Sequence, residues 1–127
     1  MATWQQVRNY IFSKYQVSND NGNFLTLVFD MGNGRSQMVH VGQIEAGEMS
    51  SVIFSSPFAD KARVSADRAL NATEVVPAAI KSIGDYYAVS HTQLLGTIDE
   101  PEIDWPIILV TTHADQLEQH LGIGDNF

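Results

Sequence analysis

Residues 24–44 decide the fold of this chain: 24–31 read FLTLVFDM, 32–34 read GNG, and 35–44 read RSQMVHVGQI. In both outer segments the side chains alternate between an apolar face and a mixed one, which is the period of a strand. The GNG between them supplies residues that readily adopt the positive φ angles of tight hairpin turns. The stretch therefore predicts a β-hairpin within an antiparallel sheet.

Further elements are predicted on both sides of this hairpin. A third strand over residues 49–54 is expected to end at the turn formers Ser-Ser-Pro at 55–57. Upstream, apolar residues at three- and four-residue spacings predict a helix over 3–15, with Thr3 as its N-cap. The turn formers SNDNGN at 18–23 are expected to separate that helix from the hairpin.

The second half of the chain predicts a short helix and a second hairpin. Residues 66–76 read ADRALNATEVV and follow Ser65, a good N-cap, while Pro77 is expected to end the helix. Strand-like residues on both sides of a Gly-Asp turn then predict a hairpin over 78–93.

The last element has two readings. The β-branched run at 107–112 suits a strand, whereas Asp104 as N-cap, Pro106 in the first turn and Gly122 as C-cap suit a helix. Apolar residues keep helical spacing, so a helix is predicted over 104–121. The whole chain is then one α+β domain in the order α-β-β-β-α-β-β-α, with one mostly antiparallel five-stranded sheet flanked by helices.

Composition limits the classes of function. The chain has 127 residues, 44% of them hydrophobic, and a formal net charge of -8. This negative field disfavours binding to nucleic acid or to anionic membranes. The absence of cysteine excludes disulfides and thiolate metal sites. Without a long apolar run or a leader-like N-terminus, the sequence predicts a cytoplasmic protein. We also expect no cofactor.

Signals for catalysis or metal binding are weak. On a helix, His113 and His120 would lie about 10.5 Å apart along the axis, too far to share one cation. His40 and His91 fall in different predicted strands, and the serines lack a nucleophile-elbow motif. We therefore predict that the chain is not an enzyme. A pocket that joined His40 or His91 to a carboxylate would reopen that question.

Four short motifs occur along the predicted elements. They are GRSQ at 34–37, SPF at 56–58, ADQLE at 114–118 and DNF at 125–127. With these motifs and this element order, the chain resembles the secretion-chaperone-like superfamily, which includes type III secretion chaperones and YbjN-like proteins. The resemblance implies a non-enzymatic domain that binds an extended or helical segment of a client protein, often as a homodimer.

Two functional hypotheses follow. The first is a chaperone-like protein, expected to form a homodimer, that binds a client protein or peptide and shields its apolar segment. Its candidate contact residues are the apolar side chains expected at the surface: Met38, Met49, Ile53, Phe58 and Trp105. The alternative is a regulatory or immunity-type protein that binds one folded partner through its acidic C-terminal third, with Glu100 and Glu102 as candidates. In either case Arg35 is expected to pair with an acid such as Asp115.

Overall fold

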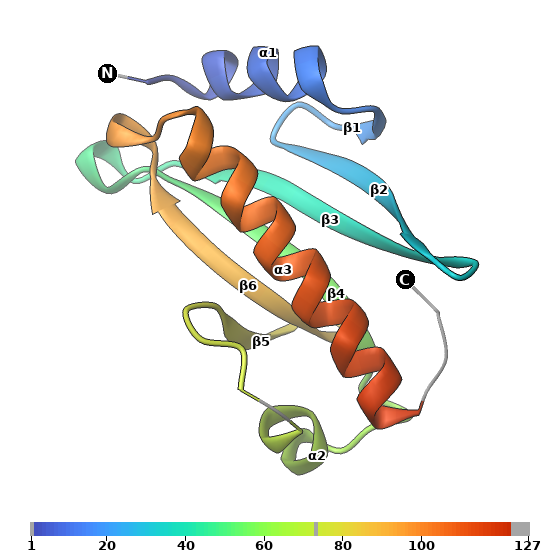
Figure 1. Ribbon diagram of the computed structural model, residues 1–127. Coiled ribbons are helices and arrows are strands. Elements are labelled where there is room, and N and C mark those ends of the chain that lie inside the picture. The colour runs from blue at the N-terminus through green and yellow to red at the C-terminus, as the bar shows by residue number, and fades with distance from the viewer. Residues whose placement is uncertain (1, 73, 123–127) are drawn as a thin grey trace.

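The computed structural model describes residues 2–72 and 74–122. Three helices and six strands follow one another in the described residues (Figure 1): α1 (Trp4–Lys14), β1 (Val17–Asp20), β2 (Phe24–Gly32), β3 (Arg35–Ile44), β4 (Ser51–Asp60), α2 (Ala66–Asn71), β5 (Ala79–Ile83), β6 (Tyr86–Leu94) and α3 (Glu100–Leu121). Short 3-10 turns occupy Gly47–Met49 and Leu95–Thr97. The predicted α+β class is confirmed.

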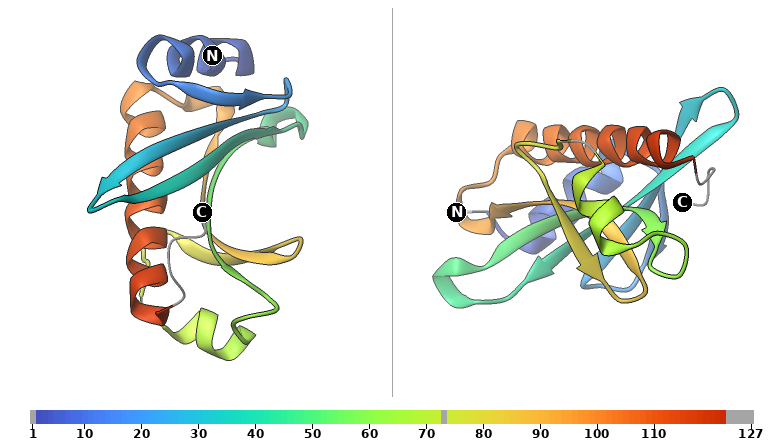
Figure 2. Two further views of the ribbon diagram at one scale, coloured as in Figure 1. Left: turned by 90° about the vertical axis from the view of Figure 1, so that its right-hand side faces the viewer. Right: turned by 90° about the horizontal axis from the view of Figure 1, so that it is seen from below.

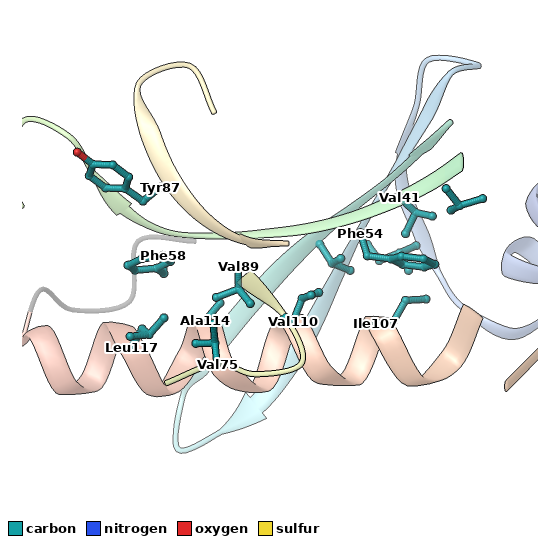
Figure 3. Close-up of a cluster of buried hydrophobic side chains, with 14 of the residues drawn as sticks. Val41, Phe54, Phe58, Val75, Tyr87, Val89, Ile107, Val110, Ala114 and Leu117 are labelled. Atoms are coloured by element: carbon teal, nitrogen blue, oxygen red, sulfur yellow. The ribbon is translucent and has the colours of Figure 1, made fainter. Parts of the chain in front are cut away.

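All strands join one antiparallel sheet in the order β1-β2-β3-β4-β6-β5. Helix α3 lies across one face of this sheet and packs on β3, β4 and β6, while α1 and α2 lie near opposite ends (Figure 1). Figure 3 shows the core between the two layers, which is formed by apolar side chains such as Val41, Phe54, Val89, Ile107 and Val110.

The sheet has six strands, not the predicted five, because Val17–Asp20 forms β1. This segment pairs with β2 as Val17↔Leu27 and Asp20↔Leu25, and only residues 21–23 make the turn. β1 is an edge strand whose side chains are mostly exposed, so they need not be apolar. Its polar composition therefore resembles that of a turn, which is what the sequence predicted.

Strand β4 runs to Asp60, well past the predicted end at residue 54. Pro57 is tolerated in this central strand because it lies beside a bulge between Pro57 and Ala59. Its position is also beyond His40↔Ser55, the last pair that β3 makes with β4. A proline therefore did not end the strand here.

Two helix boundaries also differ from the prediction. Helix α2 ends at Asn71, and Val75 joins the hydrophobic core with 6% of its surface exposed, so Pro77 is not what ends the helix. Helix α3 begins four residues earlier than predicted. Its N-cap is Asp99, whose carboxylate accepts from the Glu102 backbone N–H while the Glu102 side chain accepts from the Asp99 N–H.

Several local predictions are confirmed. Thr3 caps α1 in a capping box, and Gly122 ends α3 in the left-handed conformation with φ 68°. The turn between β2 and β3 holds Asn33 at φ 54° between two glycines that also have positive φ. Arg35 pairs with Asp115, as expected: its Nε donates to the carboxylate at 2.8 Å.

Candidate partner-binding groove

The face of the sheet turned away from α3, here called the open face, contains a groove of about 580 Å³. Its floor consists of small side chains on the central strands, namely Gly42, Ser55, Pro57 and Ala88. Larger side chains rise around that floor, namely Phe24, Ile44, Ile53, Lys81, Ile83 and Tyr86. Together with Asn23, His40, Gln43 and Ser82, these residues line what is here called the sheet groove.

The strand register explains why the floor is low. Pro57 lies opposite Ala88, and Ala88 lies opposite Lys81 on the edge strand β5. Two rows away Gly42 lies between Phe24 and Ile53, and the row between them pairs His40 with Ser55. Opposed residues of an antiparallel sheet share a face, so small side chains in the middle and large ones outside produce a trough.

Curvature of the sheet deepens this trough. In the left view of Figure 2, the connection between β3 and β4 projects to the side opposite α3, and so does the β5–β6 hairpin. The bulge in β4 beside Pro57 supplies a bend, because an extra residue in one strand increases the local twist. The open face is therefore concave where α3 does not cover it.

Apolar surface lines the groove and continues beyond it. Phe24 is 36% exposed and Ile44 is 44% exposed, although both are large hydrophobic residues in regular strands. Val28 and Leu94, which belong to the same open face, are 51% and 44% exposed. An exposed apolar patch on a concave face is typical of a surface that another molecule covers.

His40 and Lys81 are the ionisable groups within the groove apart from Tyr86. The His40 Nδ1 and the Thr26 Oγ1 are 2.9 Å apart, and burial lowers the pKa of His40 below its ordinary 6.5. None of the described residues that line the groove is an Asp or a Glu. Within the described lining of the groove, the imidazole therefore has no carboxylate of the kind that a catalytic dyad would use.

The structure separates the five apolar residues predicted for partner binding. Ile53 lines the sheet groove, and Met38 is half-buried on the same open face outside it. Met49 lies in the turn before β4 and is 66% exposed. Trp105 is 46% exposed on α3, where its ring packs edge-on against His91, on the other side of the sheet.

Phe58 was predicted to be exposed, and this is wrong. Its side chain is fully buried in the core. The prediction ended the strand before Phe58, whereas β4 continues and alternation places Phe58 on the inner face with Phe54. The bulge then turns Ala59 inward as well. Phe58 therefore contributes to stability and cannot contact a partner.

Most of the described acids in the C-terminal third are engaged within the molecule, and Asp125 lies outside the described residues. Glu100 is exposed, but Glu102 is part of the α3 cap described above. Asp104 accepts hydrogen bonds from Lys14, Tyr10 and Tyr15. Burial raises the pKa of this carboxyl, yet the three hydrogen bonds outweigh burial and hold the pKa below its ordinary 3.8.

Two further acids of α3 are held by β3. Asp115 and Glu118 are 8% and 0% exposed, and both accept from the Arg35 guanidinium, at 2.8 Å and 3.2 Å. Their charges fasten α3 to the sheet instead of forming a face for a partner. The acidic surface expected from the sequence is thus much smaller than the number of acids suggests.

Sequence reasoning missed most of the groove. Phe24, Ile44, Ile83 and Tyr86 were assigned to strands, but nothing local indicated that they share one face. The signal that could have found part of it is the alternation that places Phe24 and Val28 opposite to Leu25 and Leu27.

Comparison with models of known protein families and with curated proteins finds no match to this chain. The resemblance to the secretion-chaperone-like superfamily therefore stays a prediction. Two of its motifs, at 56–58 and 114–118, are largely buried, and the one at 125–127 lies outside the described residues.

Two further findings concern metals and membranes. Among residues 2–72 and 74–122, no three His, Asp or Glu side chains come together in a way that could hold a metal ion. No helix in the same ranges combines the length and the apolar character required to cross a membrane.

Proposed function

We propose that this chain is a non-enzymatic, chaperone-like cytoplasmic protein that binds an apolar segment of a client protein in the sheet groove. The observation that carries the proposal is a concave, apolar sheet face that α3 leaves uncovered. A volume of about 580 Å³ accommodates a few side chains of an inserted segment. A folded partner with a flat surface would leave such a hollow unfilled.

Burial of the exposed apolar side chains supplies the driving force. Removing apolar surface from water contributes roughly 25 cal/mol per Å², and Phe24, Ile44 and Ile53 offer such surface around one floor. Backbone groups of an extended client would find partners at the outer edge of β5, the last strand on that side of the sheet. The acidic exterior would keep the complex dissolved.

The experiment uses a fluorescent peptide of about ten residues in which Leu alternates with Ser, as an extended apolar probe. A matched peptide with every Leu replaced by Ser is the polar control. We expect the wild-type chain to bind the first peptide and not the second, with binding followed by fluorescence anisotropy. Light scattering at the same concentrations gives the number of chains in the complex.

Two matched variants locate the binding surface. Ile53→Asp places a charge in the groove and should weaken binding of the apolar peptide about tenfold or more. Ile108→Asp places the same charge on α3, where Ile108 is 60% exposed, and should leave binding unchanged. Equal losses in the two variants, or no binding of the apolar peptide at about 1 mM, would contradict the proposal.

A further inference from the structure

Lys81 differs from the other basic side chains of this protein. The Lys81 side chain makes no hydrogen bond, ion pair or ring contact with any residue in 2–72 or 74–122. The other basic side chains each have a contact, formed by the pairs Arg8–Asp20, Lys14–Asp104, Arg35–Asp115, Lys61–Tyr87, Arg63–Asp60 and Arg68–Leu121. Within the described residues Lys81 is thus a cation without a partner, on a protein of net charge -8.

The register places this cation at the edge of the sheet groove. Lys81 lies opposite Ala88 on β6, and Ala88 lies opposite Pro57 on β4, so the three share the open face. The next row on that face pairs Ile83 with Tyr86. An ammonium group therefore stands beside an apolar floor and an apolar rim.

Electrostatics of the groove favour an anionic partner group. The lining contains no Asp or Glu among the described residues, so nothing within it neutralises Lys81. Lys81 is exposed at the rim, so a carboxylate that entered the groove could pair with its ammonium through a charge-assisted hydrogen bond. A second basic group would instead be repelled.

We propose that the client segment bound in the sheet groove carries an Asp or a Glu among its apolar residues, and that Lys81 pairs with that carboxylate. This inference rests on the proposed function and names its substrate class: an acidic, apolar, extended segment of a protein. Lysines on edge strands also hinder pairing with other sheets. That role alone would not distinguish acidic from neutral peptides.

The test varies one residue of the probe and one of the protein. The alternating Leu-Ser peptide is prepared with Glu, Gln or Lys in place of each Ser in turn, since the position that faces Lys81 is unknown. For the wild-type chain we expect the best Glu peptide to bind about fivefold more tightly than its Gln counterpart, and the Lys peptide least tightly. Raising the salt from about 0.05 M to about 0.5 M should reduce this preference.

Charge reversal in the protein provides the decisive comparison. Lys81→Glu should reverse the order, so that the Lys peptide binds most tightly. Lys61→Glu makes the same change in net charge outside the groove and should keep the wild-type order. A reversal in both variants would mean that net charge alone decides, which would overturn the inference.

The two proposals fail in different ways. Equal binding of Glu and Gln peptides at every position would overturn the role of Lys81 and leave the groove as an apolar binding site. Failure of every peptide to bind the wild-type chain at about 1 mM would overturn the proposed function and this inference with it.

Discussion

Gly42 and Phe24 face each other across β3 and β2 so closely that a Cβ on Gly42 would lie 3.2 Å from the Phe24 Cβ. The same Cβ would lie 3.4 Å from the Asn23 carbonyl oxygen and 3.7 Å from the Ile53 Cγ2. The missing side chain therefore does two things: it lets Phe24 pack down on the sheet, and it keeps the groove floor low.

Gly42→Val tests this relationship. The branched side chain should crowd Phe24 and Ile53, lower the free energy of unfolding by about 1–3 kcal/mol, and fill part of the groove. We expect binding of the apolar peptide to weaken about tenfold or more, measured by anisotropy beside a urea titration. Thr92→Val is the control, because Thr92 lies opposite Ile53 but does not line the groove. An equal loss of peptide binding in Thr92→Val would contradict the claim that the low floor at Gly42 is needed for binding.

Phe58→Ala should destabilise the protein strongly. The side chain is fully buried, and replacing a core Phe by Ala typically costs about 3–5 kcal/mol. Met49→Ala, at a residue 66% exposed, should change the free energy of unfolding by less than about 0.5 kcal/mol. Both were candidates for partner contact, so chemical denaturation of the two variants separates a core residue from a surface one. Similar losses for both would show that the burial assigned to Phe58 is wrong.

Arg35→Met should lower the free energy of unfolding by as much as truncating a large core side chain to Ala. It removes the cation from Asp115 and the fully buried Glu118, and breaking a buried ion pair on one side costs about 3–5 kcal/mol. Glu100→Gln removes a charge at an exposed position and should change the free energy of unfolding, measured by urea titration, only slightly. An Arg35→Met chain as stable as the wild type would show that α3 is held by apolar packing alone.

His40 predicts a pH dependence of stability. Because burial lowers its pKa in the folded state, the unfolded chain binds a proton first as the pH falls through 6.5. The stability that the neutral imidazole contributes is therefore lost on acidification below that value, until the folded state also becomes protonated. Urea titrations between about pH 7.5 and about pH 5.5 should show falling stability in the wild type and a weaker slope in His40→Gln. An NMR titration in which the His40 imidazole protonates above 6.5 would contradict the expected direction.

Local sequence patterns were enough to predict the strands in which apolar side chains alternate and the helix that has a clear N-cap residue. The hairpin of β2 and β3 follows from alternation and the glycines of its turn, and α1 follows from helical spacing and Thr3. Strand β1 was not predicted, because an edge strand can consist of polar residues. Helix α3 was recognised, but its start was misplaced because Asp104 was predicted as the N-cap, whereas Asp99 is the N-cap and forms a capping box with Glu102.

The groove itself required knowledge that no local window contains. Its floor depends on β6 returning beside β4, which brings Ala88 next to Pro57 from a distant part of the chain. Its openness depends on which face α3 covers. Ile53 was predicted as a contact residue and lines the groove. Phe58, five residues later, was placed wrongly because the predicted strand ended at residue 54, whereas β4 continues and alternation carries Phe58 into the core beside Phe54 and Ser56.

The central claim is that the open face of the sheet, and not α3, binds an apolar segment. Backbone amide NMR shifts of the ¹⁵N-labelled chain, recorded as the apolar Leu-Ser peptide is added, test this most directly. We expect the largest changes at Gly42, Ile53 and Ala88, with small changes at Trp105 and Ile108. Changes centred on Trp105 and Ile108 instead, with the groove amides unmoved, would contradict the account.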